Sequence, residues 1–335
     1  MMRAAIFNGA GKPITIEQLP DPAPAPGELL VKVCRCGICG SDVSMSGDAP
    51  FTLPLGRIGH EYAGEVIEIG RDVGGFKTGD RVAVQPIEPC GHCRGCRSGN
   101  AMFCATPRHL RGGFGEYMAI PSQRAVLLPQ SLSFADGSLI EPMACGVHAW
   151  RLARLEPGET MLVTGAGSVA LSMIYWARRL GAGKIVVMSR STHRNDVVMT
   201  LGADRVISFD AEEAQIAEAL GGPPDVVAEC VGKPGMLDMA MRLVRPQGTV
   251  LSMGMCMYPE PVTPALGTFK ELKLFFPMAY TADEFVETAR AFDSGDIDPE
   301  LMVSDVIGLD DFPDVMDSLR AGTRRSLKIH VDPWL

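Results

Sequence analysis

Four cysteines within fifteen residues form the densest group of chemistry-bearing side chains in the sequence. Cys90, Cys93, Cys96 and Cys104 follow the spacing Cys-x2-Cys-x2-Cys-x7-Cys. Four thiolates at these intervals can surround one Zn²⁺ in a closed tetrahedral site, with Zn–S distances of about 2.3 Å. Disulfide bonds between residues three apart would strain the backbone. The pattern predicts a structural zinc lobe over residues 88–106, without His92 as a ligand; four free thiols in a loop are the alternative.

A thiol, an imidazole and a carboxylate form a second candidate set. Cys39 lies in the segment 36–42, His60 in the segment 59–64, and Glu141 directly before a proline. Three such ligands with one open position make a catalytic zinc site. Spacing alone cannot assemble them, because together they span more than a hundred residues. Each also has a purely structural alternative: a buried thiol, a loop histidine and a carboxylate near a helix N-terminus.

A glycine-rich turn follows a predicted buried strand at Thr160–Thr164 and leads into an amphipathic helical pattern. Its sequence, Gly-Ala-Gly-Ser-Val-Ala, matches the dinucleotide fingerprint Gly-x-Gly-x-x-Ala. In that motif the first glycine makes the turn, the second admits the pyrophosphate, and the small last residue lets the helix approach the strand. The predicted cofactor contacts in this turn are Gly165, Gly167, Ser168, Val169 and Ala170.

The residues that follow the next predicted strand, Lys184–Met188, determine whether the site prefers NAD or NADP. An NAD site places an acidic residue there, which accepts a hydrogen bond from the ribose 2′-hydroxyl. This sequence has Ser189 and Arg190 instead, with Arg194 one helical step further on. A hydroxyl and two guanidinium groups can bind a 2′-phosphate through charge-assisted hydrogen bonds. The sequence therefore favours NADP(H) over NAD(H); solvated surface arginines are the alternative.

The predicted secondary structure that positions these residues changes near residue 146. Before it, short strands alternate with glycine and proline; after it, apolar strands alternate with helical patterns, which predicts a parallel, doubly wound sheet. From about residue 287 the sequence predicts a helix and short strands. The other strands expected are Ala4–Phe7, Glu28–Cys34, Ala63–Ile69, Arg81–Val84, Val226–Cys230, Thr249–Met253 and Ser326–Val331.

Composition places the chain among globular proteins. Its 335 residues are 46% hydrophobic and 21% charged, which excludes disorder, a fibrous repeat and a disulfide-stapled miniprotein. A formal net charge of −9 argues against a nucleic-acid partner, because neutralising phosphates needs a basic face. No apolar run reaches the roughly 18 residues of a membrane span, and the N-terminus lacks the pattern of a signal peptide. We therefore expect a cytoplasmic protein with no membrane partner.

Together, these motifs resemble the zinc-dependent medium-chain alcohol dehydrogenases, particularly the branch of sorbitol, threonine and secondary-alcohol dehydrogenases. The resemblance covers nearly the whole chain and implies an α/β architecture of two domains. A mostly β, GroES-like catalytic domain would comprise residues 1–146 and 287–335, and a Rossmann nucleotide-binding domain residues 147–286. Besides the motifs above, it includes the segments 37–42, 59–61, 112–117 and 141–148.

The resemblance also implies an activity: reversible hydride transfer between a secondary (or primary) alcohol and a nicotinamide cofactor, with two zinc ions per chain, in a homodimer or homotetramer. With the cofactor that Ser189, Arg190 and Arg194 favour, the hydride acceptor is NADP⁺. Cys39, His60 and Glu141 match the catalytic zinc ligands of this branch. Glu61 is similar to the carboxylate that can approach the metal transiently. The other implied roles are those of Asp42, which fixes the tautomer of His60, Ser41, which takes the alcohol proton, and Cys145, which contacts the nicotinamide.

Two departures from the family pattern concern proton transfer and substrate. Where the family often has a proton-relaying histidine, this chain has Ser44, and where polyol-specific members have an Arg–Tyr pair, it has Ala279 and Tyr280. The alternatives are a polyol dehydrogenase that uses NAD, a zinc-free reductase of double bonds or quinones, and a non-catalytic zinc- and nucleotide-binding protein. A zinc-ribbon interaction module is a further alternative for the lobe alone.

Overall fold

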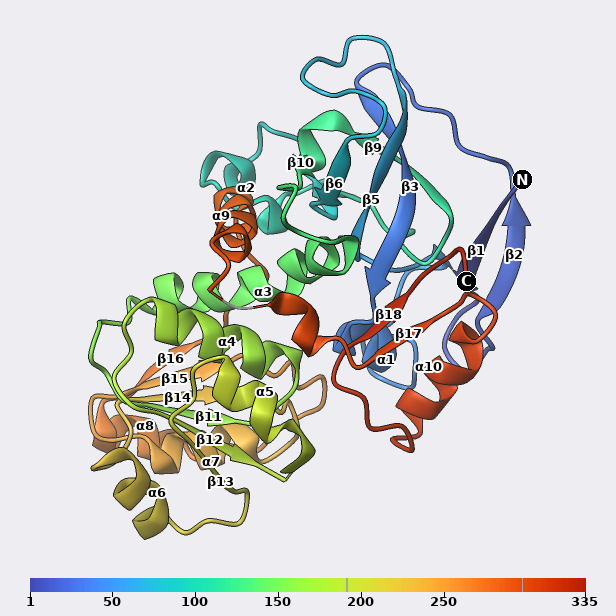
Figure 1. Cartoon of the computed structure of the whole chain (residues 1–335). Coiled ribbons are helices and arrows are strands. Elements are labelled where there is room, and N and C mark those ends of the chain that lie inside the picture. Colours follow the sequence, from blue (N-terminus) through green and yellow to red (C-terminus); the bar gives the residue numbers. More distant parts are fainter. Residues whose placement is uncertain (191, 297) are drawn as a thin grey trace. The chain divides into compact units, whose positions relative to one another are not determined.

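The computed structural model describes residues 1–190, 192–296 and 298–335, and the chain divides into two compact units (Figure 1). The first unit comprises Met1–Glu141 and Thr281–Leu335, and the second comprises Pro142–Tyr280. The first unit is therefore built from both ends of the chain, and the second is an insertion.

The two boundaries lie earlier than the expected 146/147 and 286/287, which fall inside helices α3 (Phe134–Ala153) and α9 (Ala282–Asp293). Pro142 lies within α3 and cannot donate a helical hydrogen bond, so the units divide where the helix is weakest. At the second boundary Thr281 caps α9: its hydroxyl accepts from the backbone N–H of Glu284 at 3.3 Å.

The first unit is mostly β, as expected for a catalytic domain of this type. A seven-stranded sheet runs in the order β10-β6-β5-β3-β18-β17, with β9 also paired to β3; smaller sheets are β2-β1-β4 and β7-β8. Its strands are β1 (Met2–Phe7), β2 (Thr15–Leu19), β3 (Glu28–Gly37), β4 (Gly56–Arg57), β5 (Glu61–Ile69), β6 (Arg81–Val84), β7 (Ile87–Glu88), β8 (Arg108–His109), β9 (Tyr117–Pro121), β10 (Ala125–Leu127), β17 (Asp305–Ile307) and β18 (Ile329–Val331), and its helices besides α3 and α9 are α1 (Gly40–Met45), α2 (Arg94–Arg97) and α10 (Phe312–Arg320).

The pairing of β3 with β5 brings two sequence motifs together. The strands are antiparallel, and Gly37 at the end of β3 pairs with Glu61 at the start of β5. Cys39 follows the end of β3 by two residues, and His60 immediately precedes β5, so strand register places the thiol beside the imidazole. A side chain at position 37 would overlap the Glu61 carboxylate, which explains the glycine.

The second unit is a Rossmann fold. Its six parallel strands lie in the order β13-β12-β11-β14-β15-β16, with helices on both faces (Figure 1). The order reverses between β11 and β14, which is where doubly wound sheets bind their ligands. The elements are β11 (Met161–Thr164), α4 (Ser168–Arg179), β12 (Ile185–Ser189), α5 (Asn195–Thr200), β13 (Arg205–Ser208), α6 (Glu213–Leu220), β14 (Val226–Glu229), α7 (Met236–Leu243), β15 (Thr249–Ser252), α8 (Pro264–Lys270) and β16 (Lys273–Phe275).

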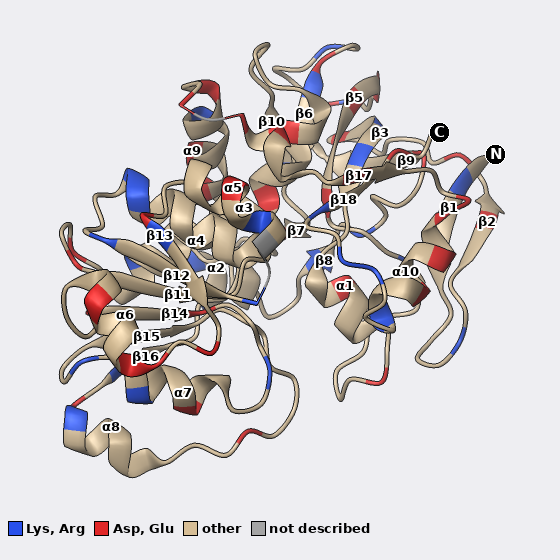
Figure 2. Cartoon of the chain, turned by 60° about the horizontal axis from the view of Figure 1, so that its bottom comes forward, with Lys and Arg blue, Asp and Glu red and all other residues tan. Residues whose placement is uncertain are grey.

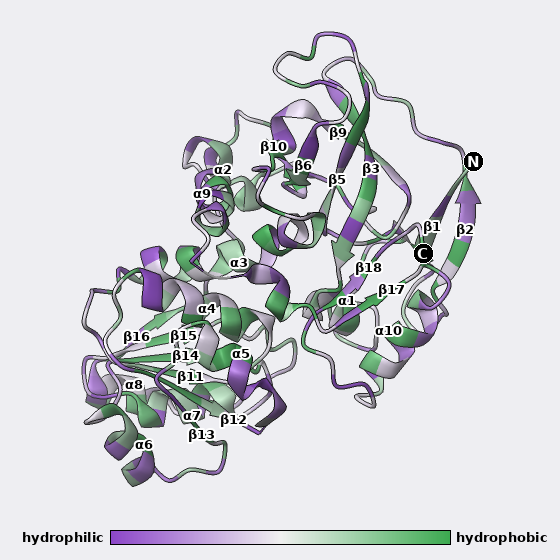
Figure 3. Cartoon of the chain, viewed as in Figure 1, coloured by the Kyte–Doolittle hydropathy of each residue, from purple (hydrophilic) through white to green (hydrophobic). Residues whose placement is uncertain are grey.

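The predicted fold class, a Rossmann domain plus a mostly β domain, is confirmed. The central strands β11, β12 and β14 are buried along their whole length, as continuous apolar runs in parallel sheets should be, and they are coloured as hydrophobic in Figure 3. Strand β18 is shorter than the expected Ser326–Val331. Lys and Arg residues lie among Asp and Glu residues over both units (Figure 2). Among the described helices, none has the length and apolarity of a membrane span.

Candidate active site

The first candidate metal centre lies where β3 ends and β5 begins. One ligand atom from each of Cys39, His60 and Glu61 lies within 4.8 Å of the other two. Cys39 is the residue before helix α1, and Glu61 is completely buried. A soft thiolate, an imidazole and a carboxylate in one group are the ligand types of a zinc site.

Asp42 orients both zinc-binding candidates. Its buried carboxylate accepts from the backbone N–H of Cys39 at 3.1 Å and lies 3.4 Å from Nδ1 of His60. Burial lowers the pKa of His60, but the charges and hydrogen bonds of Asp42 and Cys39 outweigh burial and raise it. Because Nδ1 faces Asp42, Nε2 is the nitrogen left for a metal.

Lys328 neutralises the Glu61 carboxylate. Its ammonium donates to both carboxylate oxygens of Glu61, at 2.7 and 2.9 Å, and to the carbonyl oxygen of Ile38 at 3.1 Å. Both side chains of this ion pair are almost fully buried. Burial lowers the pKa of Lys328, but the nearby Glu61 and Cys39 raise it by more than burial lowers it. The net pKa is therefore raised, and the ammonium stays charged. One cation thereby ties the segment before Cys39 to the residue after His60.

Glu141 lies on α3, outside the group of three, and near enough to Lys328 for its charge to contribute to the raised pKa of that lysine. Its predicted role as third zinc ligand stays a prediction. Ser41 is partly buried on α1, whereas Ser44, one turn later, is exposed. Cys145 is partly buried on α3 and belongs to the second unit.

The four clustered cysteines form a second candidate metal centre. Their sulfur atoms all lie within 4.8 Å of one another. The Sγ atoms of Cys90 and Cys96 are 3.8 Å apart, and those of Cys93 and Cys96 are 3.4 Å apart. A tetrahedron with Zn–S distances of about 2.3 Å has edges of about 3.8 Å, so the arrangement fits zinc. All ten cysteines are free thiols, and His92 is not among the grouped ligands.

Backbone N–H groups in this lobe stabilise cysteine thiolates, the form that binds a metal cation. The N–H groups of Cys90 and Ala105 donate to the sulfur atoms of Cys104 and Cys93, at 3.2 and 3.4 Å. Backbone hydrogen bonds lower the pKa of Cys90 and of Cys93, whereas partial burial and the neighbouring thiol of Cys93 raise the pKa of Cys96. Four thiolates this close would repel one another, and a divalent cation is the group that removes that repulsion.

The glycine-rich turn has the geometry of a dinucleotide site. Gly165 follows β11 with a φ of 90°, a left-handed conformation that favours glycine. Gly167 caps α4, whose first residues Ser168 and Val169 are partly buried, and Ala170 is fully buried against the sheet. Backbone N–H groups at such a helix N-terminus bind pyrophosphate.

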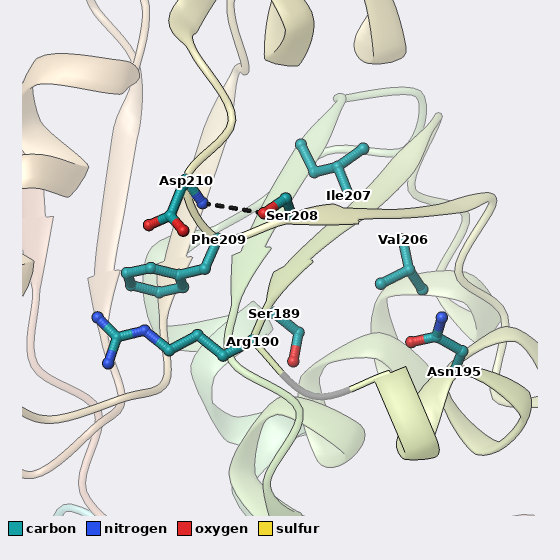
Figure 4. Close-up of a pocket in the computed structure, with 8 residues that line it drawn as sticks. All are labelled: Ser189, Arg190, Asn195, Val206, Ile207, Ser208, Phe209 and Asp210. Carbon is teal, nitrogen blue, oxygen red and sulfur yellow. Dashed lines mark hydrogen bonds between the residues drawn. The ribbon is translucent and has the colours of Figure 1, made fainter.

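A pocket of about 330 Å³ opens at the end of β12 (Figure 4). Ser189, Arg190 and Asn195 line it, together with residues of β13 and the residues that follow. The Arg190 guanidinium stacks on the ring of Phe209, with Cζ 4.6 Å from the ring centroid. Among the described residues, the buried Oδ1 of Asn195 has no hydrogen-bond partner. Arg194 donates to the carbonyl of Ala166 at 3.0 Å and so reaches the glycine-rich turn.

Two family models match the chain. The model described as alcohol dehydrogenase GroES-like domain matches residues 25–130, and the one described as zinc-binding dehydrogenase matches residues 168–294. The sorbitol dehydrogenase of Bacillus subtilis (strain 168) is 32% identical, over 99% of this chain and 97% of the relative. The chain belongs to the zinc-dependent medium-chain alcohol dehydrogenase family. The predicted family and enzyme class are confirmed.

Other relatives of this alcohol dehydrogenase differ in the substrate they are named for. The L-threonine 3-dehydrogenase of Rhizobium etli (strain CIAT 652) is 31% identical, over 100% of this chain and 99% of the relative. A protein of Sinorhizobium meliloti 1021, solved bound to NADP, matches with a TM-score of 0.87 and 29% identity, over 99% of both chains. Zinc and a nicotinamide cofactor are therefore common to the family, whereas the substrate varies within it.

The sequence motifs did not identify Lys328 as a residue of the active site of this alcohol dehydrogenase. It lies 267 positions from Glu61, and no family motif contains it. A signal existed: a lysine flanked by Leu327 and Ile329 in a predicted apolar strand needs a buried carboxylate partner, because unpaired lysines are almost never buried.

Replacing Cys96 by serine in the dehydrogenase is expected to remove one zinc ion per chain and to lower the melting temperature. Structural zinc contributes ~10–16 kcal/mol in isolated finger peptides, but the surrounding unit buffers that loss. A loss of about 3 kcal/mol would lower Tm by roughly 6–12 °C. Calorimetry and metal analysis measure both effects, with Cys34→Ser, a thiol outside the lobe, as control. Unchanged Tm and zinc content in Cys96→Ser would contradict a structural zinc site.

Proposed function

We propose that this enzyme oxidises a secondary alcohol with NADP⁺ and reduces the corresponding ketone, holding one catalytic and one structural zinc ion per chain. The observation that carries the proposal is the group of Cys39 and His60 beside a carboxylate whose charge Lys328 already neutralises. Such a group leaves coordination positions for a further ligand and for substrate, which distinguishes it from the closed four-cysteine lobe.

The residues present fit a catalytic zinc ion. Cys39 and His60 would be two ligands, and Glu141 would be the third. Glu61 is paired with Lys328, so its charge is compensated without a metal; this pairing favours Glu141 as the permanent ligand and Glu61 as the exchanging carboxylate. A zinc ion held there would supply a Lewis acid for the substrate oxygen, and a bound nicotinamide would supply the hydride acceptor or donor.

The chain's own side chains then have defined tasks. Asp42 holds Nδ1 of His60, which keeps the ring oriented and Nε2 directed to the metal. The hydroxyl of Ser41 takes the proton that leaves the alcohol. Ser44 lies one helical turn further and is exposed, so a proton passed from Ser41 in that direction would reach solvent without the histidine of other members. Proton release from Ser41 therefore ends in solvent.

The pocket at the end of β12 supports NADP(H) as the cofactor. In its lining Arg190 supplies a guanidinium group and Ser189 a hydroxyl, where an NAD site would place a carboxylate. Arg194 does not line the pocket; its guanidinium donates to the carbonyl of Ala166 in the glycine-rich turn. Asp210 also lines the pocket, but its side chain is exposed, so water and salt screen its repulsion of a phosphate. Arg190 is already held over the Phe209 ring, so its side chain loses less entropy when it binds phosphate.

The test measures kcat/KM for NADP⁺ and NAD⁺ with a panel of secondary alcohols and polyols, in wild type, Arg190→Ala and Ser189→Asp. A charge-assisted hydrogen bond is worth ~1.5–3 kcal/mol, so Arg190→Ala should weaken NADP⁺ use roughly ten- to a hundredfold and change NAD⁺ use little. Ser189→Asp should reverse the preference, because a carboxylate repels the phosphate and accepts from a free 2′-hydroxyl.

The matched control for the cofactor variants is Arg205→Ala. Arg205 is exposed on β13, does not line the pocket, and its loss changes the net charge equally. A wild type that prefers NAD⁺, or an Arg190→Ala variant that loses both cofactors equally, would contradict the NADP proposal. A preference for polyols over simple secondary alcohols would favour the polyol dehydrogenase instead.

A further inference from the structure

The loop that carries Arg111 is fixed to the segment that carries His60. The N–H groups of Gly112 and Gly113 donate to the carbonyl of Gly59, at 3.0 and 3.1 Å. The hydroxyl of Tyr62 donates to the carbonyl of Leu110 at 3.1 Å. Arg111 therefore lies one residue from a direct backbone contact with the residue before His60, in a loop with little freedom to move.

The guanidinium of Arg111 has no hydrogen bond and no ion pair with any part of the chain that the structure describes, although its Nη1 is buried. Burial lowers the pKa of Arg111, and the charge of Asp42 raises it. The buried Nε of Arg57 also lacks a partner, but the Nη2 of Arg57 donates to the carbonyls of Gly112 and Tyr117, at 3.3 and 2.5 Å. Arg108 pairs with acidic side chains on the surface. A buried cationic N–H without a partner is costly and requires an explanation.

The acidic groups near the site are already engaged. Asp42, which influences Arg111 electrostatically, accepts from the Cys39 backbone and faces Nδ1 of His60. Glu61 is held by Lys328 through two hydrogen bonds. The other titratable neighbour is His109, whose pKa is lowered by burial and then by Arg111 and His60. An imidazole offers Arg111 no negative charge. The positive charge of Arg111 is therefore available to bind an anionic ligand.

We propose that Arg111 binds an oxyanion substituent of the substrate, a carboxylate or a phosphate, so that the enzyme acts on acid-bearing secondary alcohols. This inference rests on the proposed function. A guanidinium presents a planar fork of N–H donors that matches both oxyanions, and it stays charged at any pH the enzyme meets. An acid group bound there would orient the hydroxyl-bearing carbon of the same molecule towards the segment of His60.

The test compares matched pairs of alcohols. 3-Hydroxybutanoate is paired with butane-1,3-diol, and propane-1,2-diol 1-phosphate with propane-1,2-diol, so that the carboxylate and phosphate arms are separate. For each pair, the ratio of kcat/KM for the acidic member to that for the neutral member is measured in wild type, Arg111→Met and Arg111→Lys. In at least one pair the wild-type ratio should exceed one, and Arg111→Met should lower it roughly ten- to a hundredfold. Arg111→Lys, which keeps the charge and loses the fork, should fall between.

Binding supplies a readout that does not depend on turnover. Titration calorimetry of the zinc-loaded enzyme without nicotinamide cofactor, using the two acidic probes, should show the same loss of affinity in Arg111→Met. The control is Arg108→Met, which removes an equal charge from an exposed site on the preceding strand β8. The Tm of Arg111→Met should equal or exceed that of wild type, because an unpaired buried charge is removed.

Equal losses for the acidic and neutral members, or a wild type that prefers both neutral members, would overturn the proposal. A lowered Tm with unchanged ratios would mean that Arg111 is structural. If the wild type oxidised no alcohol at all, the proposed function would fail, and calorimetry would still decide whether Arg111 binds oxyanions.

Discussion

Replacing His60 or Cys39 by alanine is expected to abolish turnover and to remove one zinc ion per chain while the fold survives. The group around Cys39 and His60 has open coordination positions, so its metal serves chemistry rather than folding. Zinc contributes several kcal/mol of charge stabilisation, and each 1.36 kcal/mol is a factor of ten in rate, so kcat should fall by a factor on the order of 1,000 or more. Steady-state kinetics, metal analysis and circular dichroism measure the three effects.

The control for the zinc-ligand variants is His92→Ala. His92 is exposed in the four-cysteine lobe, where its Nδ1 contacts only the carbonyl of Cys90 at 2.9 Å among the hydrogen bonds of the described residues. It should keep full activity and both zinc ions. A His60→Ala or Cys39→Ala variant that retained more than roughly a tenth of wild-type kcat, less than 1.4 kcal/mol of lost stabilisation, would refute that residue's assignment as a ligand.

Lys328→Met is expected to destabilise the enzyme by about 3–5 kcal/mol, because it leaves the Glu61 carboxylate buried without a counter-ion. It also removes the hydrogen bond to the carbonyl of Ile38, so zinc should dissociate faster from the site that Cys39 and His60 form. Urea unfolding gives the free energy of unfolding, and zinc release to a chelator gives the dissociation rate.

A second variant separates charge from packing. In Glu61→Gln/Lys328→Met no buried charge is left unpaired, so most of the lost stability should return. Lys77→Met, at an exposed lysine of the same unit, controls for the loss of a positive charge and should stay within about 0.5 kcal/mol of wild type. If the single and double variants were equally unstable, packing of the lysine stem, and not its charge, would be what Lys328 contributes.

The features that the sequence predicts well are those in which closely spaced residues do the chemistry. The spacing of Cys90 to Cys104 already limits which metal geometry is accessible, and the structure gathers the four sulfur atoms as expected. The turn from Gly165 to Ala170 is likewise local, because one strand and one helix N-terminus define it. Strands such as β6 and β15 were predicted within a residue because their apolar runs are bounded by turns.

The assembly of Cys39 with His60 could be predicted only through resemblance to a family. They are twenty-one positions apart in sequence, and no pattern of hydrophobicity predicts that β3 pairs with β5 through Gly37 and Glu61. Register is a property of two strands at once, and a slip of one residue would turn each side chain to the opposite face. The division between the two compact units falls inside α3, between Glu141 and Pro142, where the sequence has no loop to mark it.

The sequence by itself determined the ligand types, the cofactor turn and the alternation of elements, because each depends on residues near one another along the chain. Only the tertiary structure decided that Lys328 holds Glu61, that Asp42 faces His60, and that Arg111 is left without a counter-charge. Whether a charge is neutralised depends on distance through space and on exclusion of water. Both are fixed when strands from the two ends of the chain pair in one sheet.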